Sequence, residues 1–315
     1  MTLWWIVFAV LILTFLTLDL GVLNRRAHVI KLKEALLWTA FWVSIALLFC
    51  GGIYLFYGHQ KAMEFLAGYL IEYSLSIDNL FVFLLLFRYF HVPQEYEHKT
   101  LFWGILLALI TRGIFIFAGV ALINTFHWIM YIFGVFLIFT GFKMALNKET
   151  EVHPDKNVAI RLLRLFIPMT KEFAGARFFI IKQGKRLATP MLAVLLALET
   201  TDIVFAIDSI PAVLAITTDP FIVYTSNVFA ILGLRSLFFA ISGLMKIFHH
   251  LHYGLAAILS FVGIKMLIAD FLKIPTGISL GVIAAILALS IISSLIWPET
   301  VNPLDKKNTT KHDDK

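Results

Sequence analysis

Five acidic side chains lie inside long apolar stretches of this sequence, where a charge is expensive to bury. They are Glu72, Asp78, Glu199, Asp202 and Asp208. Placing a carboxylate at the centre of a bilayer costs about 2.5–3.5 kcal/mol or more, so such residues usually serve a function. Two arginines, Arg112 and Arg235, also fall near the middle of apolar stretches. Two positive charges leave about three carboxylates unbalanced, and either protons or a bound cation must supply the difference.

The residues beside these acids favour one class of metal. Asn79 follows Asp78 and Ser209 follows Asp208, so carboxylate, amide and hydroxyl oxygens gather without nearby His or Cys. Oxygen ligands of this kind suit Mn²⁺, Mg²⁺ or Ca²⁺ better than Zn²⁺ or Cu⁺. The simpler interpretation is that each acid pairs with an arginine and only joins helices. Arg112 and Arg235 are accordingly either structural partners or counter-ions that yield when a metal binds.

Geometry limits how these acids can meet. Residues six apart in an unbroken helix point about 120° apart around its axis. Convergence on one ion therefore requires several helices or a break. Pro211 has no N–H, which predicts a break in its helix and a free carbonyl at Ile207, next to Asp208.

The elements that hold these residues are predicted to be transmembrane helices. Of 315 residues, 60% are hydrophobic and 15% are charged, whereas a typical soluble domain is about 25% charged. The single cysteine, Cys50, excludes a disulfide framework and a four-cysteine metal site. About 20 apolar residues cross a bilayer as a helix. Nine segments qualify: Leu3–Leu23, Ala35–Tyr57, Met63–Tyr89, Leu101–Ile123, Trp128–Leu146, Thr189–Thr217, Phe221–Met245, Tyr253–Leu272 and Thr276–Trp297. The third and sixth are long enough to suggest tilt or a break.

The basic residues predict how the chain is oriented. Of the 26 Lys and Arg, 20 lie in or at the edges of alternate loops and in the C-terminal tail, two lie in the remaining loops, and four lie inside the apolar segments. Cytoplasmic loops carry the excess of basic residues. The N-terminus is therefore expected outside and the C-terminus in the cytoplasm. This distribution also accounts for the net charge of +6 without nucleic acid as a partner.

Two groups of three helices carry matching motifs in the same order. Glu72 and Asp78 match Asp202 and Asp208 at an offset of 130, and Arg112 matches Arg235 at an offset of 123. Gly141-Phe-Lys-Met144 matches Gly263-Ile-Lys-Met266 at an offset of 122. Because three is odd, the second copy enters the membrane from the opposite side. Inverted repeats of this kind build secondary transporters with a substrate site near the midplane.

The fold class predicted is thus an all-α polytopic membrane protein of nine transmembrane helices around an inverted three-plus-three repeat. Its expected parts are peripheral helices in 1–61, the first copy in 62–147, a basic cytoplasmic loop with interfacial segments in 148–187, the second copy in 188–273, a ninth helix in 274–302, and a polar cytoplasmic tail in 303–315.

Four longer motifs resemble the TerC family of integral membrane proteins, close to its Alx-like branch. They are Glu72-Tyr-Ser-Leu-Ser-Ile-Asp-Asn-Leu-Phe-Val-Phe83, Ala188-Thr-Pro190, Glu199-Thr-Thr-Asp-Ile-Val-Phe-Ala-Ile-Asp-Ser-Ile-Pro-Ala212 and Thr225-Ser-Asn-Val-Phe-Ala-Ile-Leu-Gly-Leu-Arg-Ser236. The resemblance covers nearly the whole chain. It implies a bacterial inner-membrane protein linked to tellurite resistance, with members that export manganese. It also places the family's acidic motif residues at the same five positions.

The hypothesis from the sequence is a secondary transporter that exports a divalent cation from the cytoplasm, with Mn²⁺ as the first candidate. Asp78 and Asp208 are expected as central ligands, with Glu72, Glu199 and Asp202 completing the site or carrying protons in exchange. Asn79 and Ser209 would add neutral oxygens. No ATP-binding Gly-x4-Gly-Lys-Ser/Thr motif is found, and no prosthetic group is expected. The alternatives are a tellurite or redox-stress modulator without direct transport, and an intramembrane aspartyl enzyme that uses a pair of carboxylates. The sequence leaves the coupling ion and the oligomeric state open.

Overall fold

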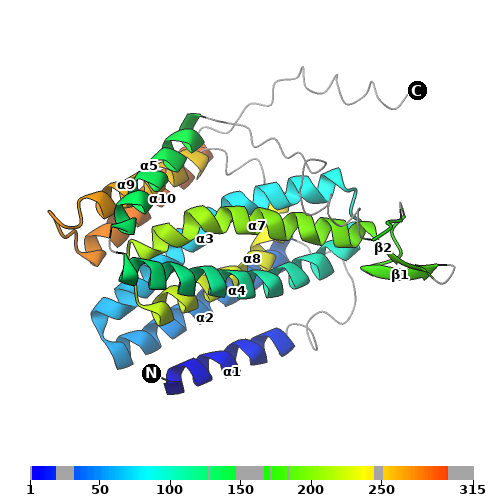
Figure 1. Ribbon diagram of the computed structural model, residues 1–315, viewed down its shortest axis with the longest axis horizontal. Coiled ribbons are helices and arrows are strands. Elements are labelled where there is room, and N and C mark those ends of the chain that lie inside the picture. Colours follow the sequence, from blue (N-terminus) through cyan, green and yellow to red (C-terminus); the bar gives the residue numbers. More distant parts are fainter. Residues whose placement is uncertain are drawn as a thin grey trace.

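The computed structural model describes residues 2–18, 32–126, 128–146, 167–170, 172–182, 185–244 and 251–296. Figure 1 shows a helical bundle with one short hairpin at its end. The helices are α1 (Thr2–Leu18), α2 (Leu32–Tyr57), α3 (His59–Tyr89), α4 (Gln94–Thr125), α5 (Ile129–Leu146), α7 (Pro190–Leu214), α8 (Pro220–Leu244), α9 (Leu251–Leu267) and α10 (Thr276–Ile296). The expected tail in 303–315 and most of the expected loop in 148–187 lie outside the described residues.

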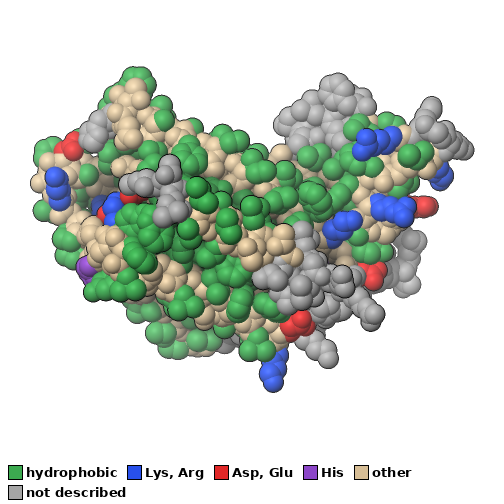
Figure 2. All heavy atoms as spheres, turned by 90° about the horizontal axis from the view of Figure 1, so that it is seen from below, with side chains coloured by type: hydrophobic (Ala, Val, Ile, Leu, Met, Phe, Trp, Pro, Cys, Tyr) green, Lys and Arg blue, Asp and Glu red, His purple; other side chains and the backbone are tan. Residues whose placement is uncertain are grey.

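The helices match the expected apolar segments closely. Seven helices in the described part of the chain are long and apolar enough to cross a membrane, and α1 and α9 are shorter apolar helices. Figure 2 shows hydrophobic side chains along the middle of one long face, with most charged side chains toward its two ends. This pattern is that of a polytopic membrane protein, because lipid tails replace water around the middle of the bundle. The count of nine spans stays a prediction.

The two helices expected to tilt or break are continuous in the structure. α3 has 31 residues, about 46 Å at 1.5 Å per residue, so it is longer than the hydrocarbon core of about 30 Å. The predicted break at Pro211 is wrong, because α7 runs through this residue to Leu214. Pro211 lies one turn from the end of α7, and its own carbonyl accepts a hydrogen bond from the N–H of Ala215. Pro211 still lacks the N–H that would bond the carbonyl of Ile207, but the helix continues beyond it for one more turn.

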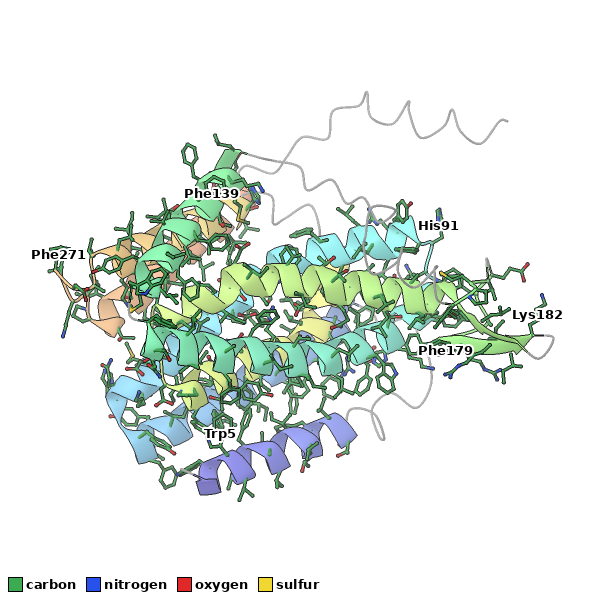
Figure 3. The ribbon with its side chains drawn as sticks, viewed as in Figure 1. Trp5, His91, Phe139, Phe179, Lys182 and Phe271 are labelled. Atoms are coloured by element: carbon green, nitrogen blue, oxygen red, sulfur yellow. The ribbon has the colours of Figure 1, made fainter. Side chains whose placement is uncertain are left out.

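A β-hairpin precedes α7, in the basic region that was expected to lie along the inner leaflet. Strand β1 (Phe179–Lys182) pairs antiparallel with β2 (Lys185–Ala188). The guanidinium of Arg186 lies 4.2 Å from the centre of the Phe179 ring, and the side chain of Ile181 is 79% exposed. Figure 3 shows Phe179 and Lys182 beyond the last turns of the long helices. We call this the hairpin end of the bundle.

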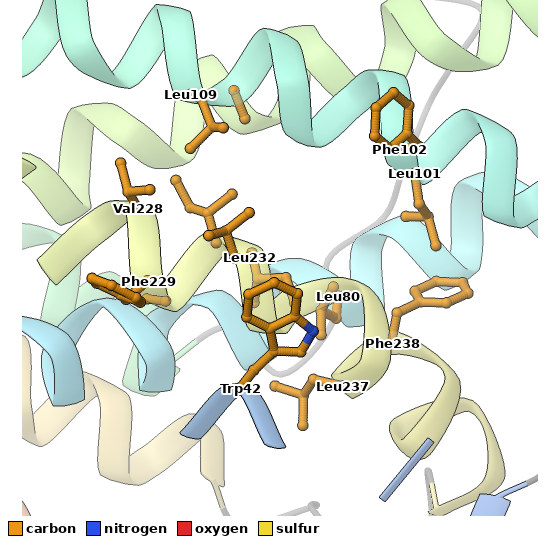
Figure 4. Packing of buried hydrophobic residues seen from close by; sticks show 14 of the residues in the cluster. Trp42, Leu80, Leu101, Phe102, Leu109, Val228, Phe229, Leu232, Leu237 and Phe238 are labelled. Atoms are coloured by element: carbon orange, nitrogen blue, oxygen red, sulfur yellow. The ribbon is translucent and has the colours of Figure 1, made fainter. Parts of the chain in front are cut away.

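Helix α8 lies at the centre of the bundle, and 89% of its span is buried. It packs against α2, α3 and α4. Figure 4 shows this core, in which Val228, Phe229 and Leu232 of α8 meet side chains from neighbouring helices. α1 packs on the outside through Trp5, whose ring lies 5.1 Å from that of Phe221. The placement of α8 means that any polar group on its inner turns must be bonded to a neighbouring helix.

Helices α5 and α9 form a second, very close contact. A Cβ added at Gly134 would lie 3.0 Å from the carbonyl oxygen of Gly263, and one added at Gly263 would lie 2.7 Å from that of Gly134. Only glycine permits such an approach between backbones. Likewise, a Cβ at Gly141 would lie 2.7 Å from the carbonyl oxygen of Ala256. At the offset of 122, Gly134 corresponds to Ala256 and Gly141 to Gly263, so these two contacts correspond to one another.

The pairs of packed helices also correspond to one another when the two predicted copies are exchanged. α3 packs on α8, α4 on α7, and α5 on α9. If the first copy is α3–α5 and the second is α7–α9, exchanging the copies leaves this set of pairs unchanged. The inverted repeat itself stays a prediction, and this packing agrees with it.

Candidate metal centre

A buried arginine joins two of the predicted acids. The Arg112 guanidinium of α4 donates from Nη2 to Oδ1 of Asp202 at 3.0 Å and from Nε to Oδ2 of the same carboxylate at 3.4 Å. Its Nη1 also donates to Oε1 of Glu72 on α3. This two-point contact with Asp202 is the geometry in which arginine binds carboxylates most strongly. Three helices therefore meet at one positive and two negative groups.

This cluster lies deep in the membrane. Asp202 is 12 residues into α7, about 18 Å from the hairpin end of that helix. Glu72 is 13 residues into α3, about 20 Å from the opposite end of the bundle. Glu72 is fully buried, and the side chain of Arg112 is 1% exposed. The site therefore lies near the middle of a 30 Å hydrocarbon core.

Neutral oxygens complete the surroundings of Arg112. Nη1 donates to Oγ of Ser209 at 3.0 Å and to Oδ1 of Asn227 at 3.3 Å. Asn227 is fully buried on α8, and its amide donates to the carbonyl oxygen of Val223 at 3.1 Å. That bond fixes the amide with its oxygen toward Arg112. The guanidinium is thus held by four oxygen-bearing side chains from α3, α7 and α8.

One carboxylate oxygen in the cluster has no hydrogen-bond partner in the part of the chain that the structure describes. Oε1 of Glu72 accepts from Arg112 and, at 3.3 Å, from the Ser76 hydroxyl. Oε2 of Glu72 is buried with no hydrogen bond among the described residues. A buried acceptor without a donor is unfavourable by about 1–3 kcal/mol. This oxygen is therefore available to a cation.

A pocket reaches the cluster from the hairpin end. It measures about 420 Å³, including its open mouth, and Glu199, Asp202 and Arg235 lie in its wall. Its other walls are apolar and come from α3, α4, α7 and α8: Leu80, Phe83, Leu101, Gly104, Ile105, Ala108, Leu198, Ile231 and Leu234. A Cβ at Gly104 would lie only 3.4 Å from Oε1 of Glu199. The absent side chain at Gly104 leaves room beside that carboxylate.

The two arginines have different environments. Arg112 is buried in the cluster, whereas Arg235 of α8 is partly exposed and lines the pocket together with Glu199. The two positions correspond at the offset of 123. The predicted pair of arginines therefore occupies one place inside the acid cluster and one place beside its approach.

Asp208, one of the two expected central ligands, is not among the hydrogen-bond partners of Arg112 in the described part of the chain. Asp208 is half-buried on α7 and accepts a hydrogen bond from the Thr140 hydroxyl of α5 at 3.3 Å. Six residues separate it from Asp202, so it points to a different side of an unbroken helix. The side chain of Asp78 lies outside the description, and Asn79 is buried on α3. In the described part of the chain, no three His, Cys, Asp or Glu side chains are close enough together to hold a metal ion.

Sequence reasoning identified Glu72, Asp202, Arg112 and Ser209 but missed Asn227. The feature of the sequence that could have pointed to Asn227 is a side-chain amide in the middle of an apolar span, within Thr225-Ser-Asn-Val. Thr140 and Ser76 were also missed, because hydroxyls are common in transmembrane helices and usually bond their own backbone.

Comparison with known proteins decides the family. The model of the integral membrane protein TerC family matches residues 57–302. This chain belongs to the TerC family. It is 52% identical to "Uncharacterized membrane protein STKORF319" of Myxococcus xanthus over 93% of this chain and 92% of that protein. It is 47% identical to "Putative membrane-bound redox modulator Alx" of Salmonella typhi over 91% of this chain and 92% of that protein. The protein of the same name in Escherichia coli strain K12 is 46% identical over 91% of this chain and 92% of its own length.

No solved structure matches the chain. The family places the protein among integral membrane proteins, and none of these three relatives has the name of an enzyme.

Proposed function

We propose that this TerC-family protein is a secondary active transporter that exports a divalent cation from the cytoplasm by alternating access. Mn²⁺ is the first candidate for that cation. The observation that carries the proposal is the meeting of Glu72 and Asp202 near the middle of the membrane, with Arg112 between them. A buried pair of carboxylates needs a positive partner. Arg112, on the separate helix α4, can supply that charge when no substrate is bound. It can release the carboxylates when a metal arrives.

The donors fit such a substrate. Glu72 and Asp202 provide charged oxygens, and Ser209 and Asn227 provide neutral ones. Glu199 stands in the wall of the pocket, where a cation would meet it first. Asp78, Asn79 and Asp208 remain proposed ligands or proton carriers in other steps of the cycle. These are the hard oxygen donors that Mn²⁺, Mg²⁺ and Ca²⁺ prefer.

The direction of transport sets the energy that is needed. With the cytoplasm negative, exporting a divalent cation is uphill by about 4.6 kcal/mol per 100 mV. Protons entering in exchange would supply this energy, and the carboxylates that release a metal are suitable proton acceptors. The proposed orientation places the hairpin end and its pocket on the cytoplasmic side.

Tracer flux tests the proposal. Inverted membrane vesicles that contain the protein should accumulate radioactive Mn²⁺, and Asp202→Asn and Glu72→Gln should abolish the uptake. Glu95→Gln, on the exposed first turn of α4, is the matched control and should transport normally. Full flux in the double variant Glu72→Gln and Asp202→Asn would reject the site. Absence of Mn²⁺, Mg²⁺ and Ca²⁺ flux in the unchanged protein would reject transport of these ions.

A redox or stress modulator is the second candidate, because the relatives from Salmonella and Escherichia carry that name. The single thiol, Cys50, is half-buried and donates to the carbonyl oxygen of Ala62 at 3.5 Å. Thiol exchange normally uses a second cysteine. A Cys50→Ser strain should therefore keep the wild-type response to tellurite, whereas Asp202→Asn should lose it through metal imbalance. Loss of that response in Cys50→Ser alone would favour a thiol mechanism.

A further inference from the structure

Corresponding residues of the two predicted copies have different roles in this structure. Glu72 and Asp202 correspond at the offset of 130, and Arg112 and Arg235 correspond at the offset of 123. Arg112 is buried and binds both acids, while Arg235 lines the pocket. A symmetric arrangement would treat the two arginines alike. The structure has therefore selected one of two equivalent ways to neutralise the same pair of carboxylates.

The walls of the pocket show the same asymmetry. Phe83, Ile105 and Leu198 line the pocket at the hairpin end. Their counterparts are Val213, Val228 and Gly68, which lie toward the opposite end. Val213 and Val228 are 0% and 1% exposed.

The packing at Gly68 leaves no space there. A Cβ at this position would lie 3.2 Å from Cγ1 of Val213 and 2.9 Å from Oγ of Ser226. Three positions that border an open space at one end therefore have closely packed counterparts at the other, where Gly68 contacts Val213 and Val228 is buried.

A polar network holds the opposite end together. Lys61 Nζ lies 3.0 Å from a carboxylate oxygen of Glu64 and 3.0 Å from one of Asp219. Glu64 also accepts from the Thr217 hydroxyl at 2.7 Å. Gln60 donates to Glu64 and to Thr276 at 3.0 Å each. These bonds tie the start of α3 to the turn before α8 and to α10, which joins the two copies at the closed end.

We propose that the protein has a second conformation in which the two copies exchange these roles. In that state Arg235 binds Glu72 and Asp202, Arg112 withdraws, and a pocket opens around Gly68, Val213 and Val228. The pocket at the hairpin end closes at the same time. The inference rests on the transport function proposed above and adds to it the specific exchange of arginines.

This exchange has a clear physical purpose. Two carboxylates left alone in the low-dielectric interior would be strongly unfavourable. An arginine supplied alternately by α4 and α8 keeps them paired in both empty states. In each state one arginine pairs with the carboxylates and its counterpart lines the open pocket. A cation entering from either side therefore meets an equivalent competitor, Arg112 in the present state and Arg235 in the second.

Thiol labelling tests the exchange without any measurement of transport. The background is Cys50→Ser, which removes the only cysteine, and the reporters are the counterparts Ile105→Cys and Val228→Cys. Each is reacted with a water-soluble maleimide in proteoliposomes that expose both faces. Ile105→Cys should react faster in the parent.

Gly68→Leu should act as a wedge in the closed contact. It should raise the labelling rate of Val228→Cys by roughly fivefold or more and lower that of Ile105→Cys correspondingly. The control is Gly281→Leu on α10, where an added Cβ meets nothing within 4 Å, and it should change neither rate.

The arginines provide the second arm of the test, and their effects should be opposite in sign. Arg112→Gln should favour the second state and increase labelling at Val228→Cys. Arg235→Gln should favour the present state and reverse the effect of the wedge.

Equal effects of the two arginine variants, or a wedge that leaves both labelling rates unchanged, would overturn the exchange. If Gly68→Leu does not fold, Glu64→Gln replaces it as the means of loosening the closed end. Flux with unchanged labelling would leave the transport proposal standing and reject only the exchange. The expected labelling without Mn²⁺ flux would support the exchange of arginines and reject the transport of Mn²⁺.

Discussion

Glu72 of α3 and Asp202 of α7 are 130 residues apart in the chain and bind the same guanidinium, that of Arg112 on α4. α3 and α7 also pack directly on one another, and the arginine links their two carboxylates. A buried ion pair is weak evidence for stability, because desolvation offsets much of the attraction. Its position near the midplane, at the end of a pocket, is better explained by binding than by structure alone.

Replacing Arg112 tests whether it competes with the substrate. Arg112→Gln removes the positive charge and leaves two buried carboxylates, which should lower the free energy of unfolding by about 3–5 kcal/mol. In the present conformation the same change also removes the competitor, so Mn²⁺ should bind this conformation about tenfold more tightly and restore much of the lost stability. Thermal unfolding in detergent, with and without Mn²⁺, measures both effects.

The control for this variant is Arg186→Gln, on the exposed hairpin, which should change neither quantity. Arg112→Lys should be intermediate, because lysine keeps the charge but cannot form the two-point contact with Asp202. Weaker Mn²⁺ binding in Arg112→Gln would mean that the arginine helps to hold the metal site rather than competing for it.

Two aspartates six residues apart on α7 distinguish the cluster in the structure from the pair expected from the sequence. Asp202→Asn should abolish Mn²⁺ binding measured by calorimetry, because it removes a carboxylate from the cluster. Asp208→Asn should keep binding within about threefold, since that side chain bonds Thr140 on another face of the helix. Loss of binding in Asp208→Asn with normal binding in Asp202→Asn would favour the pair Asp78 and Asp208.

The sequence predicted the helices well because their signal is local. An apolar run of about 20 residues must be helical in a bilayer, where backbone groups need internal partners. The charged residues of the cluster were equally visible, since an acid such as Glu72 stands out against an apolar background. Their partners were not visible, because the neutral side chain of Asn227 becomes important only when α8 is packed against α4 and α7.

Two predictions failed or were incomplete for physical reasons. Pro211 suggested a break, but a proline removes only one N–H donor, and α7 continues through it to Leu214. The hairpin at Phe179–Ala188 was missed because a run of alternating basic and apolar residues suits both an interfacial segment and a strand. The direction of Asp208 also depended on which neighbouring helix would supply its partner.

Filling the pocket should block transport without unfolding the protein. Gly104→Leu adds a side chain next to Glu199, in space bounded by apolar residues. We expect Mn²⁺ flux to fall at least about tenfold while the free energy of unfolding falls by only about 1–3 kcal/mol, the usual cost of an inserted side chain. Gly52→Leu on α2, where an added Cβ meets nothing within 4 Å, is the matched control. Normal flux in Gly104→Leu would show that the substrate reaches the cluster by another route.

The network at the end opposite the hairpin should set how readily that end opens. Glu64→Gln removes the carboxylate that Lys61, Gln60 and Thr217 share. Each exposed ion pair contributes only about 0–1 kcal/mol, but Glu64 is buried and charge-assisted hydrogen bonds are worth about 1.5–3 kcal/mol. The variant should therefore unfold at a slightly lower temperature and show faster hydrogen exchange at the start of α3 and of α8. Glu95→Gln, exposed at the hairpin end, should leave exchange there unchanged. If exchange in Glu64→Gln rises equally at both ends of the bundle, the network stabilises the whole fold and does not act as a local closure.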